Sequence, residues 1–301
     1  MTVVDWLLDG DPAIRWQAMA DLADAPPATV QAERARVGRE GWGAQILAAQ
    51  DDDGRWGAGT FFPRGIGTFD TLHLLLLLGI DPQSPELQHA LGPVHEAARW
   101  DYDASFRFFD GEVEPCINGR VVAIGATFGK DVRGVVERLI GEQMADGGWN
   151  CERENGSVRG SFDTTINVLE GLLAYETFVA PDGDVRVARE RGEEYLLERR
   201  LLHRLSDGAM PQPRWLAPAF PDSWNYDVVR ALDHFRRARS TLDERMREAL
   251  DIVAGKRLPD GRWNLEAAHH EASHVDLGES IGQPSRWITL RALRILQWAG
   301  A

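Results

Sequence analysis

The sequence contains few cysteines and no long apolar run. Its 301 residues include two cysteines, Cys116 and Cys151, which are too few for the disulfide framework of a secreted scaffold, and we expect both thiols to be reduced. The longest apolar stretch, residues 72–80, is interrupted by His73 and is far shorter than the roughly 20 residues that span a bilayer. The first residues, MTVVDWLLDGD, lack the basic segment of a signal peptide. We therefore expect a cytoplasmic protein without a transmembrane segment.

Basic residues are in the minority. The chain has 33 Lys and Arg against 47 Asp and Glu, which gives a formal net charge of −14. A surface that binds nucleic acid is expected to be basic, because it must neutralise phosphates. This balance argues against a nucleic acid or an anionic membrane surface as partner. It does not indicate the oligomeric state.

Tryptophan, by contrast, is abundant, with 11 tryptophans against four tyrosines, and part of the excess lies in a repeat. The segments QDDDGRWG, QMADGGWN and LPDGRWN begin at Gln50, Gln143 and Leu258. Six Asp-Gly pairs, separated by 36 to 61 residues, start at positions 9, 53, 110, 146, 207 and 260. Asp-Gly favours a turn, because Gly adopts positive φ and Asp bonds nearby backbone. A seventh pair, Asp182-Gly183, does not fit the series and is interpreted as an ordinary loop.

Each repeated turn is followed by a segment with helical periodicity. These apolar segments cover residues 11–24, 68–80, 114–128, 161–176, 223–238 and 284–298. More highly charged helical segments precede most of the turns, at residues 85–100, 132–144, 188–205 and 242–258. No alternating run is long enough for a strand. The pattern predicts an all-α protein, a single α/α-toroid domain over residues 1–301, in which about six helical hairpins form an inner and an outer ring.

The tryptophan segments resemble the QW repeat of squalene–hopene and oxidosqualene cyclases, whose superfamily includes the β subunits of protein prenyltransferases. The resemblance implies that Gln50 and Gln143 cap the next helix and that the tryptophans pack against it as structural staples. The third copy has no glutamine before its turn. A terpenoid cyclase or prenyltransferase would bind an isoprenoid or another small apolar ligand in a central cavity.

The cyclase motifs themselves are missing. Neither D-x-D-D, which supplies the protonating aspartic acid of class II cyclases, nor the metal-binding D-D-x-x-D of class I enzymes occurs. Asp51-Asp52-Asp53 is interpreted as a solvated turn. We therefore expect no cofactor, with one alternative: by resemblance to the prenyltransferases, Glu114, Cys116 and Asp163 would be zinc ligands at two successive helix starts.

The starts of the inner helices provide the candidate site. In an α/α barrel these starts surround one mouth of the central cavity, where polar groups with aromatic walls would suit a ligand. The candidate acid–base residues are Asp70, His73 and Asp163, because a carboxyl group desolvated in a cavity can act as a general acid. The candidate ligand-binding residues are Cys116, Asn118, Thr164, Tyr226, Asp227, Arg286 and Trp287.

A second polar cluster lies in the segment AAHHEASHVDLGE. It contains His269, His270, His274, Asp276 and Glu279, between a tryptophan turn and Pro284. We interpret the segment as a long loop that can cover the cavity mouth, with metal binding as the alternative.

Two functional hypotheses remain open at this stage. The first is an enzyme that cyclises, isomerises or transfers an isoprenoid-like substrate. The second is a non-catalytic toroid, a scaffold that binds a ligand or a protein partner. A sugar-active α/α barrel, which would use Asp70 and Asp163 as paired carboxylates, is a third and is not favoured by the QW pattern.

Overall fold

The computed structural model describes residues 2–269 and 272–300, and they form an all-helical protein. Thirteen α-helices and four short 3-10 helices are found in these ranges, which contain isolated β-bridges and no β-strand. The prediction of an all-α fold is confirmed. None of the helices in the described part of the chain is both long and apolar enough to cross a membrane.

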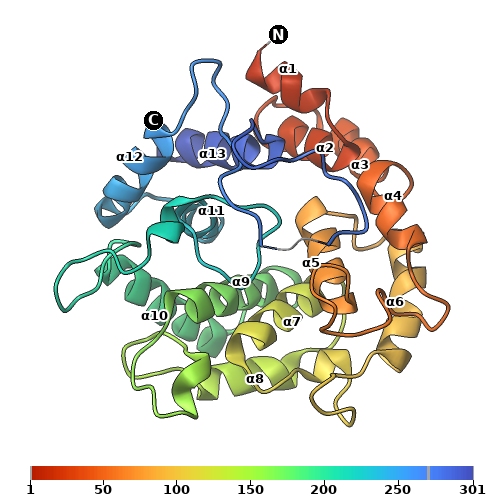
Figure 1. Cartoon of the computed structure of the whole chain (residues 1–301), viewed down its shortest axis with the longest axis horizontal. Helices are drawn as coiled ribbons and strands as arrows, with labels where there is room; N and C mark the ends of the chain where they lie inside the picture. The colour runs from red at the N-terminus through yellow and green to blue at the C-terminus, as the bar shows by residue number, and fades with distance from the viewer. Residues whose placement is uncertain (1, 270–271, 301) are drawn as a thin grey trace. The chain divides into compact units, whose positions relative to one another are not determined.

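The contacts divide the chain into two units (Figure 1). Unit 1 comprises Met1–Arg107, Ala219–Ser223 and Ala254–Ala301, and unit 2 comprises Phe108–Pro218 and Trp224–Val253. The chain therefore passes between the units four times. One domain over residues 1–301 stays a prediction.

The helices of each unit are short. Those of unit 1 are α1 (Val3–Leu8), α2 (Pro12–Asp21), α3 (Pro27–Arg34), α4 (Gly41–Ala48), α5 (Thr68–Leu78), α6 (Pro85–Ala97) and α13 (Arg286–Ala299). Those of unit 2 are α7 (Pro115–Thr127), α8 (Arg133–Gly141), α9 (Phe162–Phe178), α10 (Gly183–Glu198) and α11 (Val228–Ala238). Helix α12 (Arg247–Gly255) begins in unit 2 and ends in unit 1.

All six apolar and all four charged helical segments expected from the periodicity are present, and side-chain caps set several of their starts. The Ser161 side chain accepts a hydrogen bond from Thr164 N at the start of α9, and Ser285 accepts one from Ile288 N at the start of α13. Asp182 lies, as expected, in the loop between two helices, and it is the last residue before α10. Its carboxylate caps α10, because an Asp-Gly pair supplies an N-cap as readily as a turn.

Helices α7 and α9 form the centre of unit 2 and pack with their backbones almost in contact (Figure 1). A Cβ atom on Gly119 would clash with the Asn167 carbonyl, and one on Gly171 would clash with the Gly119 carbonyl. The side chain of Arg120 donates to Asn167 Oδ1 at 2.9 Å across the same contact. Nearer the two helix starts, Cys116 of α7 and Thr164 of α9 both contact Cys151 Sγ, at 3.1 and 3.5 Å, so the two helices begin at the same end and run in the same direction.

The three repeated tryptophans fasten each turn to the helices beside it. They are at most 1% exposed, which confirms their interpretation as buried staples. Each donates its backbone N–H to a threonine hydroxyl in the following apolar helix. The pairs are Trp56 with Thr68, Trp149 with Thr165, and Trp263 with Thr289, at 3.0–3.1 Å.

The indoles and the glutamines add further contacts. Trp149 Nε1 donates to the Leu139 carbonyl of α8 at 2.6 Å, and Trp56 makes the same bond to α4. Gln143 Nε2 donates to the carbonyls of Gly147 and Ala188, both at 2.8 Å. Because Ala188 lies inside α10, the glutamine joins its turn to the body of α10 and does not cap α9, the helix that follows it in the sequence.

Candidate functional site

The two cysteines of the chain meet at the start of α7. Glu114 is the residue before this helix, Pro115 is its first residue, and Cys116 is its second. Cys151 follows the Trp149 turn and opens the short 3-10 helix Cys151–Arg153. Since Trp149 is held by Thr165 of α9, the close packing of α7 and α9 brings Cys151 to Cys116.

The contacts within this cluster are short. Cys116 Sγ lies 3.1 Å from Cys151 Sγ and 3.6 Å from Glu114 Oε2. The Thr164 hydroxyl lies 3.5 Å from Cys151 Sγ. The hydrogen bond to Cys151, together with burial, raises the pKa of Cys116 far above its ordinary value. The same hydrogen bond lowers the pKa of Cys151, so Cys151 is the more acidic of the two thiols.

This arrangement suits a tetrahedral metal ion. One ligand atom from each of Glu114, Cys116 and Cys151 lies within 4.8 Å of the other two, and no other such group occurs in residues 2–269 and 272–300. Zinc bonds of about 2.3 Å to sulfur and about 2.1 Å to oxygen place the sulfur and oxygen ligands about 3.6 Å apart. Two sulfur ligands are about 3.8 Å apart in the same geometry. The Glu114–Cys116 distance matches, whereas the two sulfurs, at 3.1 Å, would have to move apart by about 0.7 Å.

Asp163, the third zinc ligand that the prenyltransferase resemblance implied, is engaged elsewhere. Its Oδ1 accepts a hydrogen bond of 2.6 Å from the Tyr226 backbone N–H, and its Oδ2 accepts one of 2.8 Å from Arg214. The group that could hold a metal contains Cys151 in its place. Asp163 thereby joins the start of α9 to the segment that precedes α11.

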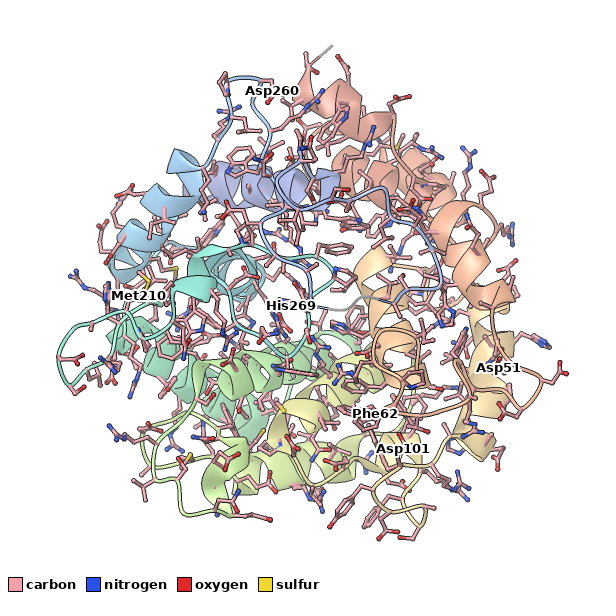
Figure 2. The ribbon with its side chains drawn as sticks, in the orientation of Figure 1. Asp51, Phe62, Asp101, Met210, Asp260 and His269 are labelled. Atoms are coloured by element: carbon pink, nitrogen blue, oxygen red, sulfur yellow. The ribbon has the colours of Figure 1, made fainter. Side chains whose placement is uncertain are left out.

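Asp70 lies in the first turn of α5, as Asp163 does in α9, and it is likewise bound by an arginine. Arg64 binds both of its carboxylate oxygens at 2.7 and 2.8 Å, and Gly65 N–H donates to Oδ2 at 2.7 Å. In the same loop, the backbone N–H groups of Phe61 and Phe62 donate to Asp101 at 2.8 and 3.1 Å (Figure 2). These contacts favour an anchoring role for Asp70, and its acid–base role stays a prediction. His73 is 4% exposed and lies on the same helix, α5.

The other predicted ligand-binding residues of unit 2 form hydrogen bonds with backbone groups of unit 2. Asn118 exchanges two hydrogen bonds with the backbone of Glu112, at 2.6 and 2.7 Å. The Tyr226 hydroxyl donates to the Leu201 carbonyl at 2.7 Å, and its ring is buried. Asp227 caps α11 by accepting a hydrogen bond from Arg230 N. Their contacts hold loops in place, whereas Thr164 is the one that reaches the thiols.

In unit 1, Arg286 and Trp287 open α13. Arg286 stacks over the Trp6 ring at 4.6 Å and donates to the Trp6 carbonyl. Trp287 is 2% exposed and stacks on Phe220 with ring centroids 4.2 Å apart. Both side chains therefore pack within unit 1. Their ligand-binding role stays a prediction.

The histidine- and acid-rich segment before α13 does not assemble a metal group in the described part of the chain, from which His270 is excluded. His274 Nε2 lies 2.8 Å from the Ile66 carbonyl and 3.1 Å from the Thr71 hydroxyl. The Asp276 carbonyl accepts from the Trp42 indole, and Glu279 accepts from Arg286 N. His274, Asp276 and Glu279 thus contact other parts of unit 1, and the role of the segment as a cover over a cavity mouth stays a prediction.

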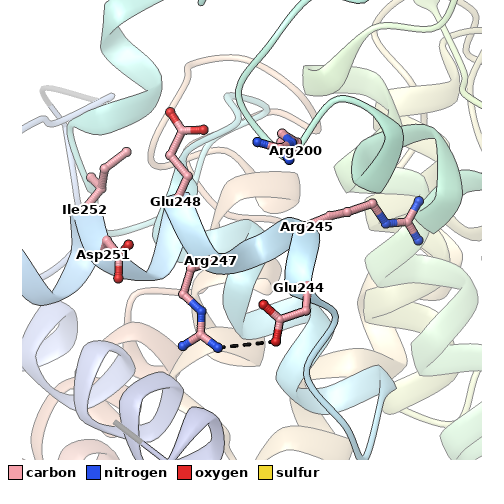
Figure 3. Close-up of a pocket in the computed structure, with 7 residues that line it drawn as sticks. All are labelled: Arg200, Glu244, Arg245, Arg247, Glu248, Asp251 and Ile252. Carbon is pink, nitrogen blue, oxygen red and sulfur yellow. Dashed lines mark hydrogen bonds and ion pairs between the residues drawn. The ribbon is translucent and has the colours of Figure 1, made fainter.

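Unit 2 also carries charged surface grooves. One of about 520 Å³ is lined by Arg200, Glu244, Arg245, Arg247, Glu248, Asp251 and Ile252 (Figure 3). Most of these side chains are paired with each other or with neighbours, as Arg247 is with Glu244 at 3.4 Å. A lining of this kind does not suit an apolar ligand, and it contains none of the residues expected from the sequence.

Cys151 is the member of the cluster that reasoning from sequence missed. It lies two residues after Trp149 in the repeat, at the start of a three-residue 3-10 helix that is too short to show a period in the sequence. The only signal was that the chain has two cysteines and that the other one, Cys116, opens an apolar helix.

No protein-family model matches the chain, and no curated protein is significantly similar to it.

Proposed function

We propose that the protein is a zinc-dependent transferase of the prenyltransferase type, with Glu114, Cys116 and Cys151 as the metal ligands. The observation that carries this proposal is the meeting of these three side chains at the start of α7. Three protein ligands leave one coordination position open, which is typical of catalytic and not of structural zinc sites. Zinc held by these residues would lower the pKa of a thiol or water bound to it, which would supply a nucleophile at neutral pH.

Thr164 at the start of α9, and Arg214 of the 3-10 helix Pro213–Leu216, supply the remaining parts of the proposed site. Thr164 contacts Cys151 and orients its sulfur. Arg214 is 42% exposed and is held by Asp163 and Asn225, so its guanidinium is positioned while remaining accessible to solvent. We assign it to an anionic group of the substrate, such as the diphosphate of a prenyl donor.

The ring arrangement of the hairpins belongs to the same proposal. We infer a closed α/α toroid with an isoprenoid or similar apolar ligand in its centre. Two features support it: the common direction of α7 and α9, and the same tryptophan–threonine contact in three separate hairpins. The resemblance to the QW repeat supplies the substrate class.

A non-catalytic scaffold is the second candidate, and one observation favours it over acid–base cyclisation. Asp70 and Asp163 are the two carboxylates at equivalent helix starts, and each is bound by an arginine and a backbone N–H. A general acid must present its proton to the substrate. Carboxylates held in this way are better suited to anchoring loops.

Metal analysis of the reduced, purified protein tests the proposal. We expect one zinc ion per chain, lost in the Cys116→Ser and Cys151→Ser variants and retained in Asp163→Asn, which is the matched control. Zinc that is retained in Cys151→Ser and lost in Asp163→Asn would instead support the ligand set that the resemblance implied. Wild-type protein that binds no added zinc at all would refute the metal site.

Enzymatic activity is tested separately from metal binding. The zinc-loaded protein is incubated with farnesyl diphosphate and a small thiol, and the release of diphosphate is followed. We expect release that depends on zinc and falls in an Arg214→Gln variant that still binds zinc. A zinc-loaded protein that releases none with prenyl diphosphates of several lengths would support the scaffold.

A further inference from the structure

The two cysteines are also placed to react with each other. They are 35 residues apart in sequence, their sulfurs are 3.1 Å apart, and both are partly exposed. We propose that Cys116 and Cys151 form a reversible disulfide in a reaction with a hydroperoxide, and that this disulfide switches off metal binding at the same site. The formation of the disulfide stands on the geometry alone, whereas the switching rests on the proposed function.

The movement that the reaction needs is small. A disulfide bond is about 2.05 Å long, so the sulfurs must approach by about 1 Å. Cys116 is fixed by α7, but Cys151 lies in a three-residue 3-10 helix followed by an exposed loop. The approach can therefore come from Cys151 without disturbing the packing of α7 on α9.

Neighbouring groups support the chemistry. The Thr164 hydroxyl contacts both the sulfur and the backbone N–H of Cys151, at 3.5 and 3.4 Å, and so orients the residue toward Cys116. The exposed carboxylate of Glu114 accepts the hydrogen bond from Cys116 at 3.6 Å and provides an acceptor for the proton that this thiol loses.

The reaction proceeds in two balanced steps. In the first, one sulfur attacks a peroxide oxygen, the O–O bond breaks, a sulfenic acid forms and water leaves. In the second, the other sulfur attacks the sulfenic sulfur, the S–S bond forms, the S–O bond breaks and a second water leaves. Two thiols are oxidised and one hydrogen peroxide is reduced by two electrons. The disulfide removes two of the three metal ligands, and Glu114 alone cannot retain the ion.

The first experiment treats reduced, chelator-stripped protein with hydrogen peroxide. We expect an intact mass lower by two hydrogens in the monomer, loss of both free thiols together, and recovery of both with dithiothreitol. Cys116→Ser and Cys151→Ser are matched controls, since the chain has no other cysteine. Each should give only a singly modified or an intermolecularly linked chain. Wild-type protein that keeps both thiols, or that instead adds oxygen irreversibly, would overturn the proposal.

The second experiment separates the two proposals. Zinc-loaded protein is treated with hydrogen peroxide, and released zinc is followed with a colorimetric chelator. Release of one zinc per disulfide formed supports the switch, and retention of zinc on the oxidised protein overturns it. A reduced protein that binds no zinc but forms the disulfide refutes the proposed function and the switch while leaving the reactive thiol pair established. A protein that binds zinc but does not form the disulfide after the zinc is stripped refutes the disulfide and the switch, and it leaves the proposed metal site standing.

Discussion

Glu193 should stabilise the protein strongly at neutral pH and much less in acid. Its side chain is fully buried in unit 2, where its carboxylate oxygens contact His234 Nε2 at 3.1 Å, Arg239 Nε at 2.8 Å and the guanidinium of Arg189. Burial alone would raise the pKa of Glu193, but His234 and the two arginines outweigh burial and lower it to about 2, from an ordinary value of 4.5.

The magnitude follows from this difference. A depressed pKa in the folded state means that the stabilisation is present above the unfolded pKa and is lost as the pH falls toward the folded pKa. A difference of about 2.5 pKa units corresponds to about 3 kcal/mol at pH 7. The same values leave about 2 kcal/mol at about pH 3.5. Glu193→Gln should therefore destabilise the protein by about 3 kcal/mol at pH 7 and progressively less below about pH 4.5.

Urea unfolding of the wild type and the variant, measured at several pH values between 7 and 3.5, tests this expectation. The matched control is Glu194→Gln, on the next residue. Glu194 pairs with Arg245 on the surface, where it is 48% exposed, so its loss should cost less than about 1 kcal/mol. The reasoning is refuted if the Glu193→Gln and Glu194→Gln variants lose equal stability, or if the Glu193→Gln loss is the same at every pH.

Three further predictions concern packing, the staples and the thiols. Gly119→Ala should destabilise the protein by about 1–3 kcal/mol in urea unfolding, because the added Cβ would clash with the Asn167 carbonyl. The control is Gly134→Ala, whose added Cβ meets no neighbouring atom, so that this variant should be neutral or stabilising. Trp149→Phe should lower the free energy of unfolding by about 1–3 kcal/mol, because the Leu139 carbonyl loses its buried hydrogen-bond donor. An unchanged midpoint in urea would show that this hydrogen bond does not stabilise the protein. The oxidised thiol pair should raise stability by about 4 kcal/mol over the reduced protein, through a closed loop of 35 residues. Equal thermal midpoints for the two forms would contradict that estimate.

The helices could be predicted from the sequence because their signals are local. Apolar periodicity marked α9 and α13, and serine caps set where each of them begins. The repeated tryptophans were recognisable as staples for the same reason, since each contacts the helix that follows its own turn. The short helices α1, α3 and α4 were missed, because six to eight residues hold too few turns to show a period.

The candidate site could be predicted only in part, since it depends on contacts between distant segments. The position of Asp163 at a helix start was readable, but its partner Arg214 lies 51 residues later in a four-residue 3-10 helix that shows no periodicity. Cys151 was hidden for the same reason. Its approach to Cys116 requires the close packing of α7 on α9, which Gly119 and Gly171 permit, and glycine spacing alone does not reveal which helices meet.

The division of the chain into two interrupted units has a consequence for protein synthesis. The last residue of unit 2 is Val253, whereas unit 1 includes α13 (Arg286–Ala299), which follows unit 2 in the sequence. Arg291 of α13 binds both carboxylate oxygens of Asp222, and Trp287 stacks on Phe220, so unit 1 lacks these contacts until α13 has left the ribosome. A nascent chain stalled before α13 can therefore have completed unit 2 while unit 1 remains unfinished and exposes the apolar faces that α13 covers. Of the two units, the one whose synthesis begins first is the last to be completed.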